Sequence, residues 1–214
     1  ADMDEFDVFM PRSAADFARE IVATNMLPFF FLPLIITIFC ADFGNGTYRN
    51  TLSYETNRTK VYLSKLILSV CGCVFLTLVS LLLSILIGGI AFGFGGLTPA
   101  FFLQILVSTL LLLPIQLAII GFGHCLVAFT KKSSMTIAIY LIALMLLTSL
   151  IQMLTMIPSL QWLSLLDWNM VGKLMISYWT LPFSDILIAV VSGLAIAAGT
   201  TVLGVTHYRK ADMA

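Results

Sequence analysis

Charged side chains are scarce in this sequence, and the stretches between them are long and apolar. Asp, Glu, Lys and Arg make up 10% of the residues and hydrophobic residues 60%, whereas ordinary globular chains carry about 25% charged and about 45–50% apolar residues. Too few polar groups are present to cover the surface of a water-soluble domain. The composition therefore excludes a soluble protein and predicts an integral membrane protein.

The sequence also lacks the residue patterns of enzymes and proton-coupled carriers. It has no Gly-x-x-x-x-Gly-Lys-Ser/Thr loop to bind a phosphate, no pair of acids within an apolar stretch, and no disulfide framework or zinc spacing among its four cysteines. His124 and Cys125 are adjacent, so on a helix their side chains point about 100° apart and cannot act as base and nucleophile. We predict a protein that is not an enzyme, with no catalytic residues, no cofactor or metal bound directly and no nucleic-acid partner.

Five apolar stretches are long enough to cross a membrane. A hydrocarbon core about 30 Å thick needs about 20 apolar helical residues, and runs of consecutive leucines lack the alternation of a membrane β-barrel. We therefore predict an all-α membrane protein with a single transmembrane domain over residues 1–214. The five predicted transmembrane helices are residues 21–41, 66–90, 101–129, 135–157 and 184–205.

Two local signals add to this picture of five helices. The segment Ser13-Ala-Ala-Asp16 resembles a capping box and predicts a helical turn before the first transmembrane helix. Pro28, Pro33 and Pro114 lie at membrane depth, where proline kinks a helix and frees backbone carbonyls for neighbouring helices.

The positions of lysine and arginine predict the orientation in the membrane, because short cytoplasmic loops retain these residues. Eight bases follow the first, third and fifth predicted helices, and three lie on the opposite side with the acidic N-terminal segment. We expect a multi-pass protein of the plasma membrane with its C-terminus in the cytoplasm and residue 1 outside. We also expect an earlier transmembrane helix before residue 1; the alternative is an N-out protein whose short acidic head inserts directly.

Residues 158–182 are too apolar for a solvated loop and too often interrupted by polar residues for a transmembrane helix. Such a segment is typical of short helices that re-enter the outer leaflet or lie at its interface, anchored by aromatic side chains. We predict that Trp162, Trp168 and Trp179 belong to an outer gate or interface. The alternative is an interfacial helix with no role in gating.

The loop between the first two predicted helices, residues 42–65, holds the densest set of polar side chains. Gly44 and Gly46 break the helix that leaves the membrane, and residues 47–53 can form a short helix across the cytoplasmic face. Ser53 or Thr56 can cap the next helix, which carries basic residues into the headgroup region. A simple turn between two helices needs far fewer polar side chains than this loop contains.

This loop resembles the coupling region of type-2 ATP-binding-cassette (ABC) exporter permeases, in particular the bacterial branch that handles bacitracin, lantibiotics and other amphipathic peptides. The pattern is an acidic residue, a Gly-Thr pair, a short coupling helix, a basic residue and a serine-lysine entering the next transmembrane helix. The residues that carry the resemblance are Asp42, Gly46, Thr47, Arg49, Asn50, Leu52, Arg58, Lys65 and Leu66.

The resemblance implies a six-helix permease fold, here without its first transmembrane helix, and re-entrant outer helices at residues 158–182. It implies a subunit that exports amphipathic peptides of the toxin, antimicrobial or lantibiotic type, and that pairs with a second permease copy, identical or paralogous. ATP and Mg would bind to separate ABC ATPase subunits that dock on the coupling loop. The alternative is a stand-alone membrane immunity or scaffold protein that binds a peptide without ATP. The ATPase-coupling residues implied are Asp42, Gly46, Thr47, Tyr48, Arg49, Asn50, Leu52, Glu55 and Arg58.

Overall fold

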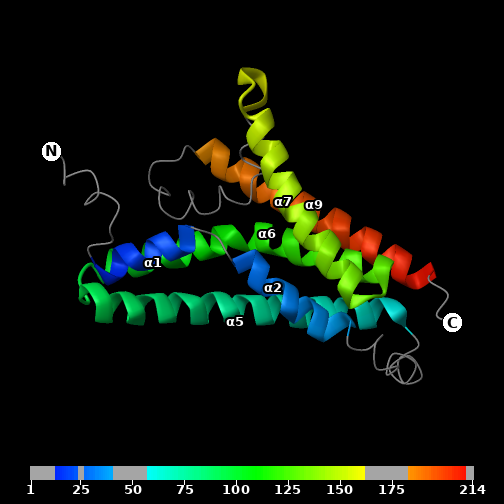
Figure 1. Cartoon of the computed structure of the whole chain (residues 1–214), viewed down its shortest axis with the longest axis horizontal. Coiled ribbons are helices and arrows are strands. Elements are labelled where there is room, and N and C mark those ends of the chain that lie inside the picture. Colours follow the sequence, from blue (N-terminus) through cyan, green and yellow to red (C-terminus); the bar gives the residue numbers. More distant parts are fainter. Residues whose placement is uncertain (1–12, 24–26, 41–56, 162–182, 211–214) are drawn as a thin grey trace.

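A computed structural model of the chain describes residues 13–23, 27–40, 57–161 and 183–210 (Figure 1). Every regular element in these residues is a helix, and four helices are long and apolar enough to cross a membrane. The chain is therefore an all-helical, multi-pass membrane protein. The four long helices, which correspond to the last four predicted ones, are α5 (Arg58–Phe92), α6 (Pro99–Thr130), α7 (Ser133–Leu154) and α9 (Phe183–Lys210).

The structure describes the first predicted transmembrane helix, residues 21–41, in separate helical pieces. Helix α1 (Ala14–Ala23) ends within it, and α2 (Leu27–Ile35) continues as a single π-helical turn, η1 (Ile36–Cys40). Pro33 lies inside α2, where it has no N–H to donate to the carbonyl four residues earlier. Together α2 and η1 rise only about 21 Å, which is shorter than the core of a bilayer. The described helical pieces of this stretch are therefore each shorter than the predicted transmembrane helix, and residues 24–26 and 41 lie outside the described residues.

Helix α5 begins eight residues before the predicted transmembrane stretch, since its basic first turns are also helical. The side chain of Asn57 caps it by accepting a hydrogen bond from Thr59 N over 3.2 Å, so the predicted caps at Ser53 or Thr56 are wrong. Long basic side chains extend from apolar helix surfaces to the headgroups, which explains why the helix continues beyond the apolar run. It ends at Gly93, whose φ of 85° suits glycine.

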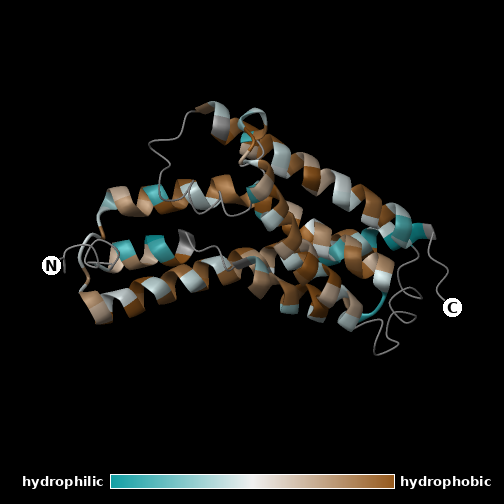
Figure 2. Cartoon of the chain, turned by 45° about the horizontal axis from the view of Figure 1, so that its top comes forward, coloured by the Kyte–Doolittle hydropathy of each residue, from teal (hydrophilic) through white to brown (hydrophobic). Residues whose placement is uncertain are grey.

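Helix α1 lies between α5 and α6 (Figure 2). As its capping box predicts, Asp16 N donates to Ser13 Oγ over 3.2 Å. Ala14 N donates to Gly93 O at the end of α5, and a Cβ added to Gly88 would lie 2.9 Å from Phe17 Cβ. The glycine therefore allows α1 to approach α5 closely.

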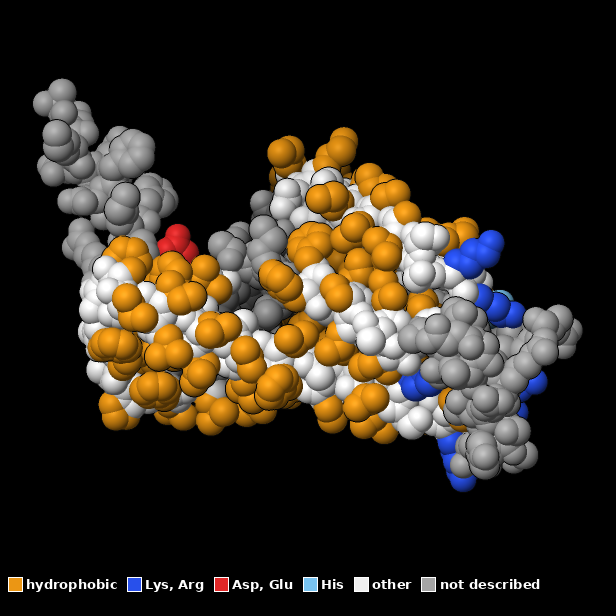
Figure 3. All heavy atoms as spheres, turned by 60° about the horizontal axis from the view of Figure 1, so that its bottom comes forward, with side chains coloured by type: hydrophobic (Ala, Val, Ile, Leu, Met, Phe, Trp, Pro, Cys, Tyr) orange, Lys and Arg blue, Asp and Glu red, His pale blue; other side chains and the backbone are white. Residues whose placement is uncertain are grey.

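Basic side chains gather at one end of the helical bundle (Figure 3). This end, called the basic end below, contains the start of α5, the turn between α6 and α7, and the end of α9. The opposite end, called the far end, contains the start of α1 and the connection from α5 to α6. This placement agrees with the prediction that these connections lie on the same side of the membrane. The basic end carries Arg58, Lys60, Lys65, Lys131, Lys132 and Arg209.

Candidate functional site

Most of the predicted site residues lie outside the part of the chain that the structure describes. Arg58 is the one predicted ATPase-coupling residue with a described position. The structure tests neither the short coupling helix at residues 47–53 nor the re-entrant outer segment. The predicted residues outside the described ranges are Asp42, Gly46, Thr47, Tyr48, Arg49, Asn50, Leu52 and Glu55 of the coupling loop, and Trp162, Trp168 and Trp179 of the outer segment.

Arg58 connects the start of α5 to the end of α9. Its Nη1 donates to the backbone carbonyl of Arg209 over 3.2 Å, and a hollow lined by Asn57, Arg58, Thr59 and Arg209 lies at this contact. The last carbonyls of a helix have no partner within the helix and carry the negative end of its dipole. A guanidinium is therefore well matched to this position, and it ties the exit of the predicted coupling loop to the last transmembrane helix.

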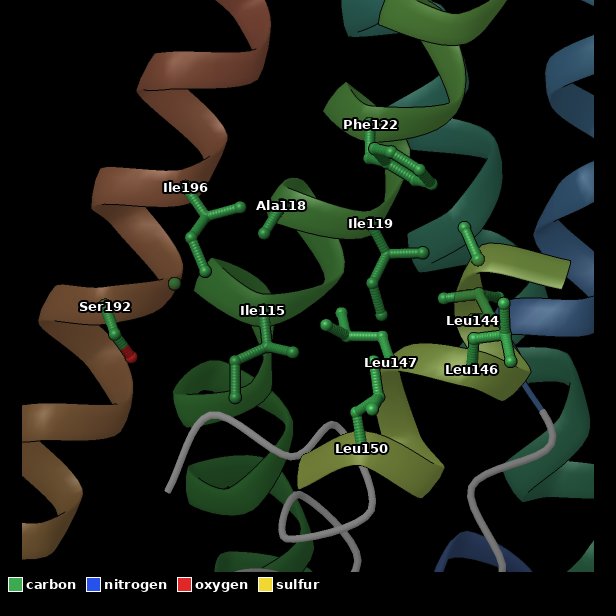
Figure 4. Close-up of a pocket in the computed structure, with 12 residues that line it drawn as sticks. Ile115, Ala118, Ile119, Phe122, Leu144, Leu146, Leu147, Leu150, Ser192 and Ile196 are labelled. Atoms are coloured by element: carbon green, nitrogen blue, oxygen red, sulfur yellow. The ribbon is translucent and has the colours of Figure 1, made fainter. Parts of the chain in front are cut away.

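An apolar cavity of about 400 Å³ lies between α6, α7 and α9 (Figure 4). Ala118 from α6 and Ile196 from α9 point toward one another across it, and Leu147 and Leu150 contribute from α7. Among the lining residues, Ser192 alone has a polar side chain. Pockets of this size hold small ligands or parts of larger ones. These apolar walls suit an aliphatic or aromatic group, which they would select by its shape and not by hydrogen bonds.

Small residues hold α9 closely against α6 on one side of this cavity. A Cβ added to Gly193 would lie 3.0 Å from the backbone of both Pro114 and Ile115, and one added to Gly121 would lie 2.6 Å from Thr200 Oγ1. Such close approach transmits displacements, because packed helices with no free space move together. A shift at the basic end of α9 would therefore reach the cavity wall at Ile196, about 20 Å along the same helix.

His124 lies on another face of α6, away from this cavity. Its Nε2 is 2.7 Å from Ser69 Oγ on α5, and its ring meets Phe39 edge to face with centroids 5.0 Å apart. The partner of His124 is thus a serine on another helix and not the adjacent Cys125. Among the described residues, no group of three or more His, Cys, Asp or Glu side chains could hold a metal ion.

Sequence reasoning missed both the cavity and the Ser69–His124 pair. The cavity gives no signal, since a leucine facing lipid and a leucine facing a cavity look alike in sequence. The Ser69–His124 pair does leave a signal in the sequence. Small polar residues stand at every fourth position of an otherwise apolar helix, at Ser69, Cys73 and Thr77. That spacing places small polar groups on one face.

Comparison of the sequence and the structure with family models, curated proteins and solved structures finds no match.

Proposed function

We propose that this chain is the transmembrane permease subunit of an ATP-driven ABC exporter that moves amphipathic peptides out of the cell. One observation carries the proposal: Arg58, the last of the predicted ATPase-coupling residues, donates to the Arg209 carbonyl at the end of α9, and α9 also forms a wall of the apolar cavity. A force applied to the loop before α5 therefore has a direct route to a candidate substrate site.

In this mechanism, separate ATPase subunits bind residues 42–58 at the basic end and supply ATP and Mg. Their closure on nucleotide pulls the start of α5, and the Arg58–Arg209 contact passes this displacement to α9. The cavity between α6, α7 and α9 then changes shape and releases the apolar groups of its cargo. The nucleotide biases an element with two arrangements, as in other switching proteins. A second permease copy completes the transport unit.

The test combines recovery of a partner with a matched pair of charge reversals. The chain is expressed with its native neighbours, purified in mild detergent and examined for a soluble ATPase at equal stoichiometry. Arg58→Glu should reduce ATPase recovery or ATP-driven peptide export by about ten-fold, the effect of losing roughly 1.4 kcal/mol of interaction. Lys132→Glu is the control, because it makes the same charge reversal at an exposed position of the same end.

Membrane levels of both variants should equal that of the wild type. Wild-type protein that binds an amphipathic peptide but never recovers an ATPase would contradict the proposal. That outcome would favour the stand-alone immunity or scaffold protein instead.

A further inference from the structure

Polar side chains are concentrated where α5 faces α6. Among the described residues, every buried Ser, Thr, Gln or His side chain except Thr136 lies on one of these two helices. Beyond Tyr62, the buried side chains of α5 are all small. This face costs stability in a lipid environment unless its polar groups find partners. The small buried residues are Ser69, Cys73, Thr77, Ser84, Gly88 and Gly89.

The polar contacts between α5 and α6 follow one antiparallel register. His124 Nε2 lies 2.7 Å from Ser69 Oγ. Eight residues further along each helix, Gln116 Nε2 donates to Thr77 Oγ1 over 3.5 Å. Eight residues rise about 12 Å, so these two contacts stand at successive levels across the membrane.

The same register continues toward the far end. Leu112, four residues before Gln116, packs against Leu81, four residues after Thr77. One more turn places Ser108 level with residue 85, beside Ser84. We call this set the polar seam: Ser69, Thr77 and Ser84 on α5, with Ser108, Gln116 and His124 on α6.

At the far end the polar seam reaches charged groups. Gln104, one turn beyond Ser108, accepts a hydrogen bond from Arg19 Nη2 over 3.2 Å, and Arg19 also pairs with Asp16 over 3.3 Å. The side chains of Arg19 and Asp16 are 34% and 47% exposed. From Gln104 to His124 the helix rises about 30 Å, which is the thickness of the hydrocarbon core.

Three atoms of the polar seam have unused hydrogen-bonding capacity. Within the described residues, Ser108 Oγ, Gln116 Oε1 and His124 Nδ1 are buried without a partner, and their residues are 2%, 7% and 0% exposed. Lipid tails cannot complete these hydrogen bonds, whereas water can.

We propose that the polar seam binds water between α5 and α6 and forms a hydrated path across the membrane. A peptide backbone presents the same donors and acceptors as water, so the path also takes the polar backbone of the cargo while the apolar cavity on another face of α6 takes its apolar side chains. Only this second step rests on the proposed function. The hydration itself requires neither cargo nor ATPase.

Two native cysteines of α5 provide a matched test. Cys73 is fully buried on α5, one turn from Ser69 and one turn from Thr77 of the polar seam, whereas Cys71 is exposed on another face of the same helix. Two single-cysteine variants are made by changing the other three cysteines to alanine. Each is placed in lipid nanodiscs and treated with Ag⁺, an ion close to water in size, which replaces the thiol proton to form a silver thiolate.

The readout is the loss of maleimide labelling after denaturation. Ag⁺ should block Cys73 about ten times faster than Cys71, because thiols react through an ionised form that requires water and not lipid. A Cys73 that reacts no faster than Cys71 would overturn the proposal. Rapid reaction of Cys73 in a protein that recovers no ATPase would support hydration and remove only the cargo step.

A second variant tests whether polar groups produce the reactivity. Gln116→Leu in the Cys73 background should slow the Ag⁺ reaction toward the Cys71 rate, with a single monodisperse peak in gel filtration as the control for folding. Ser108→Ala, which removes only one hydroxyl, gives the same test should the leucine variant fail to fold. An unchanged rate in the folded variants would contradict a water path that depends on these side chains.

Discussion

His124 on α6 and Ser69 on α5 are hydrogen-bonded across the helix interface, with 2.7 Å between Nε2 and Oγ and both residues 0% exposed. The rings of Phe39 and Tyr62 lie edge to face with the imidazole, with centroids 5.0 and 6.1 Å away. In such apolar surroundings an unpaired imidazole nitrogen is costly. The pair therefore fixes how far α5 slides along α6 and sets the register of the polar seam.

Removing the Ser69 hydroxyl should destabilise the fold. Ser69→Ala leaves His124 Nε2 buried without its partner, and we expect a loss of about 1–3 kcal/mol in the free energy of unfolding. Thermal unfolding in detergent, followed by gel filtration, measures it. Ser64→Ala is the control, since this exposed serine donates to Val61 O of its own helix. Equal unfolding temperatures for the two variants would contradict a structural role for the pair.

Two glycines of α9 should respond oppositely to alanine. At Gly193 the new Cβ would meet the backbone of Pro114 and Ile115 at 3.0 Å, and a backbone cannot rotate away. Gly193→Ala should therefore cost about 1–3 kcal/mol by overpacking. At Gly199 a Cβ would have nothing within 4 Å, so Gly199→Ala should be neutral or stabilise by about 0.5–1 kcal/mol. The unfolding temperature of each variant in detergent, compared with that of the wild type, measures the effect. A Gly193→Ala protein as stable as the wild type would contradict the close packing of α6 on α9.

The sequence alone predicts the membrane-spanning part well, because length and apolar composition decide it. Helices α5, α6, α7 and α9 all contain or closely overlap their predicted stretches. Prediction fails where tertiary contacts decide. Apolar residues 21–41 look like one helix, yet Ser13 caps a separate helix that packs on Gly88, and Tyr140 OH donates to the Pro28 carbonyl at the start of α2.

The candidate site is only partly visible in sequence for a related reason. Basic and turn residues of the predicted coupling loop stand out because they interrupt an apolar chain. The apolar cavity is invisible, since Ile115 and Ile196, which line it, have the same residue type as the isoleucines that face lipid. Only the packing of three helices separates the residues that line a cavity from those that face lipid.

Filling the apolar cavity should impair transport without affecting assembly. Ala118 is buried at the cavity wall, between α6 and α9. Ala118→Leu places three further carbons in the space that the proposed cargo occupies, and peptide export should fall about ten-fold or more. Ala198→Leu is the control, because Ala198 is exposed on the outer face of α9. Export in cells is the measurement, with ATPase recovery as the check on assembly; unchanged export would remove the cavity from the transport route.

The two ends of the bundle should be accessible from opposite sides of the membrane. Gly95 is exposed in the connection between α5 and α6 at the far end, and Ser133 is exposed beside Lys132 at the basic end. Because basic loops stay in the cytoplasm, an impermeant maleimide added to sealed cells should label Gly95→Cys and leave Ser133→Cys unlabelled until the membrane is permeabilised. Both variants are made without the native cysteines, and both keep every lysine and arginine that sets the orientation. Labelling of Ser133→Cys in sealed cells would place the basic end outside, where no ATP-driven subunit could reach Arg58.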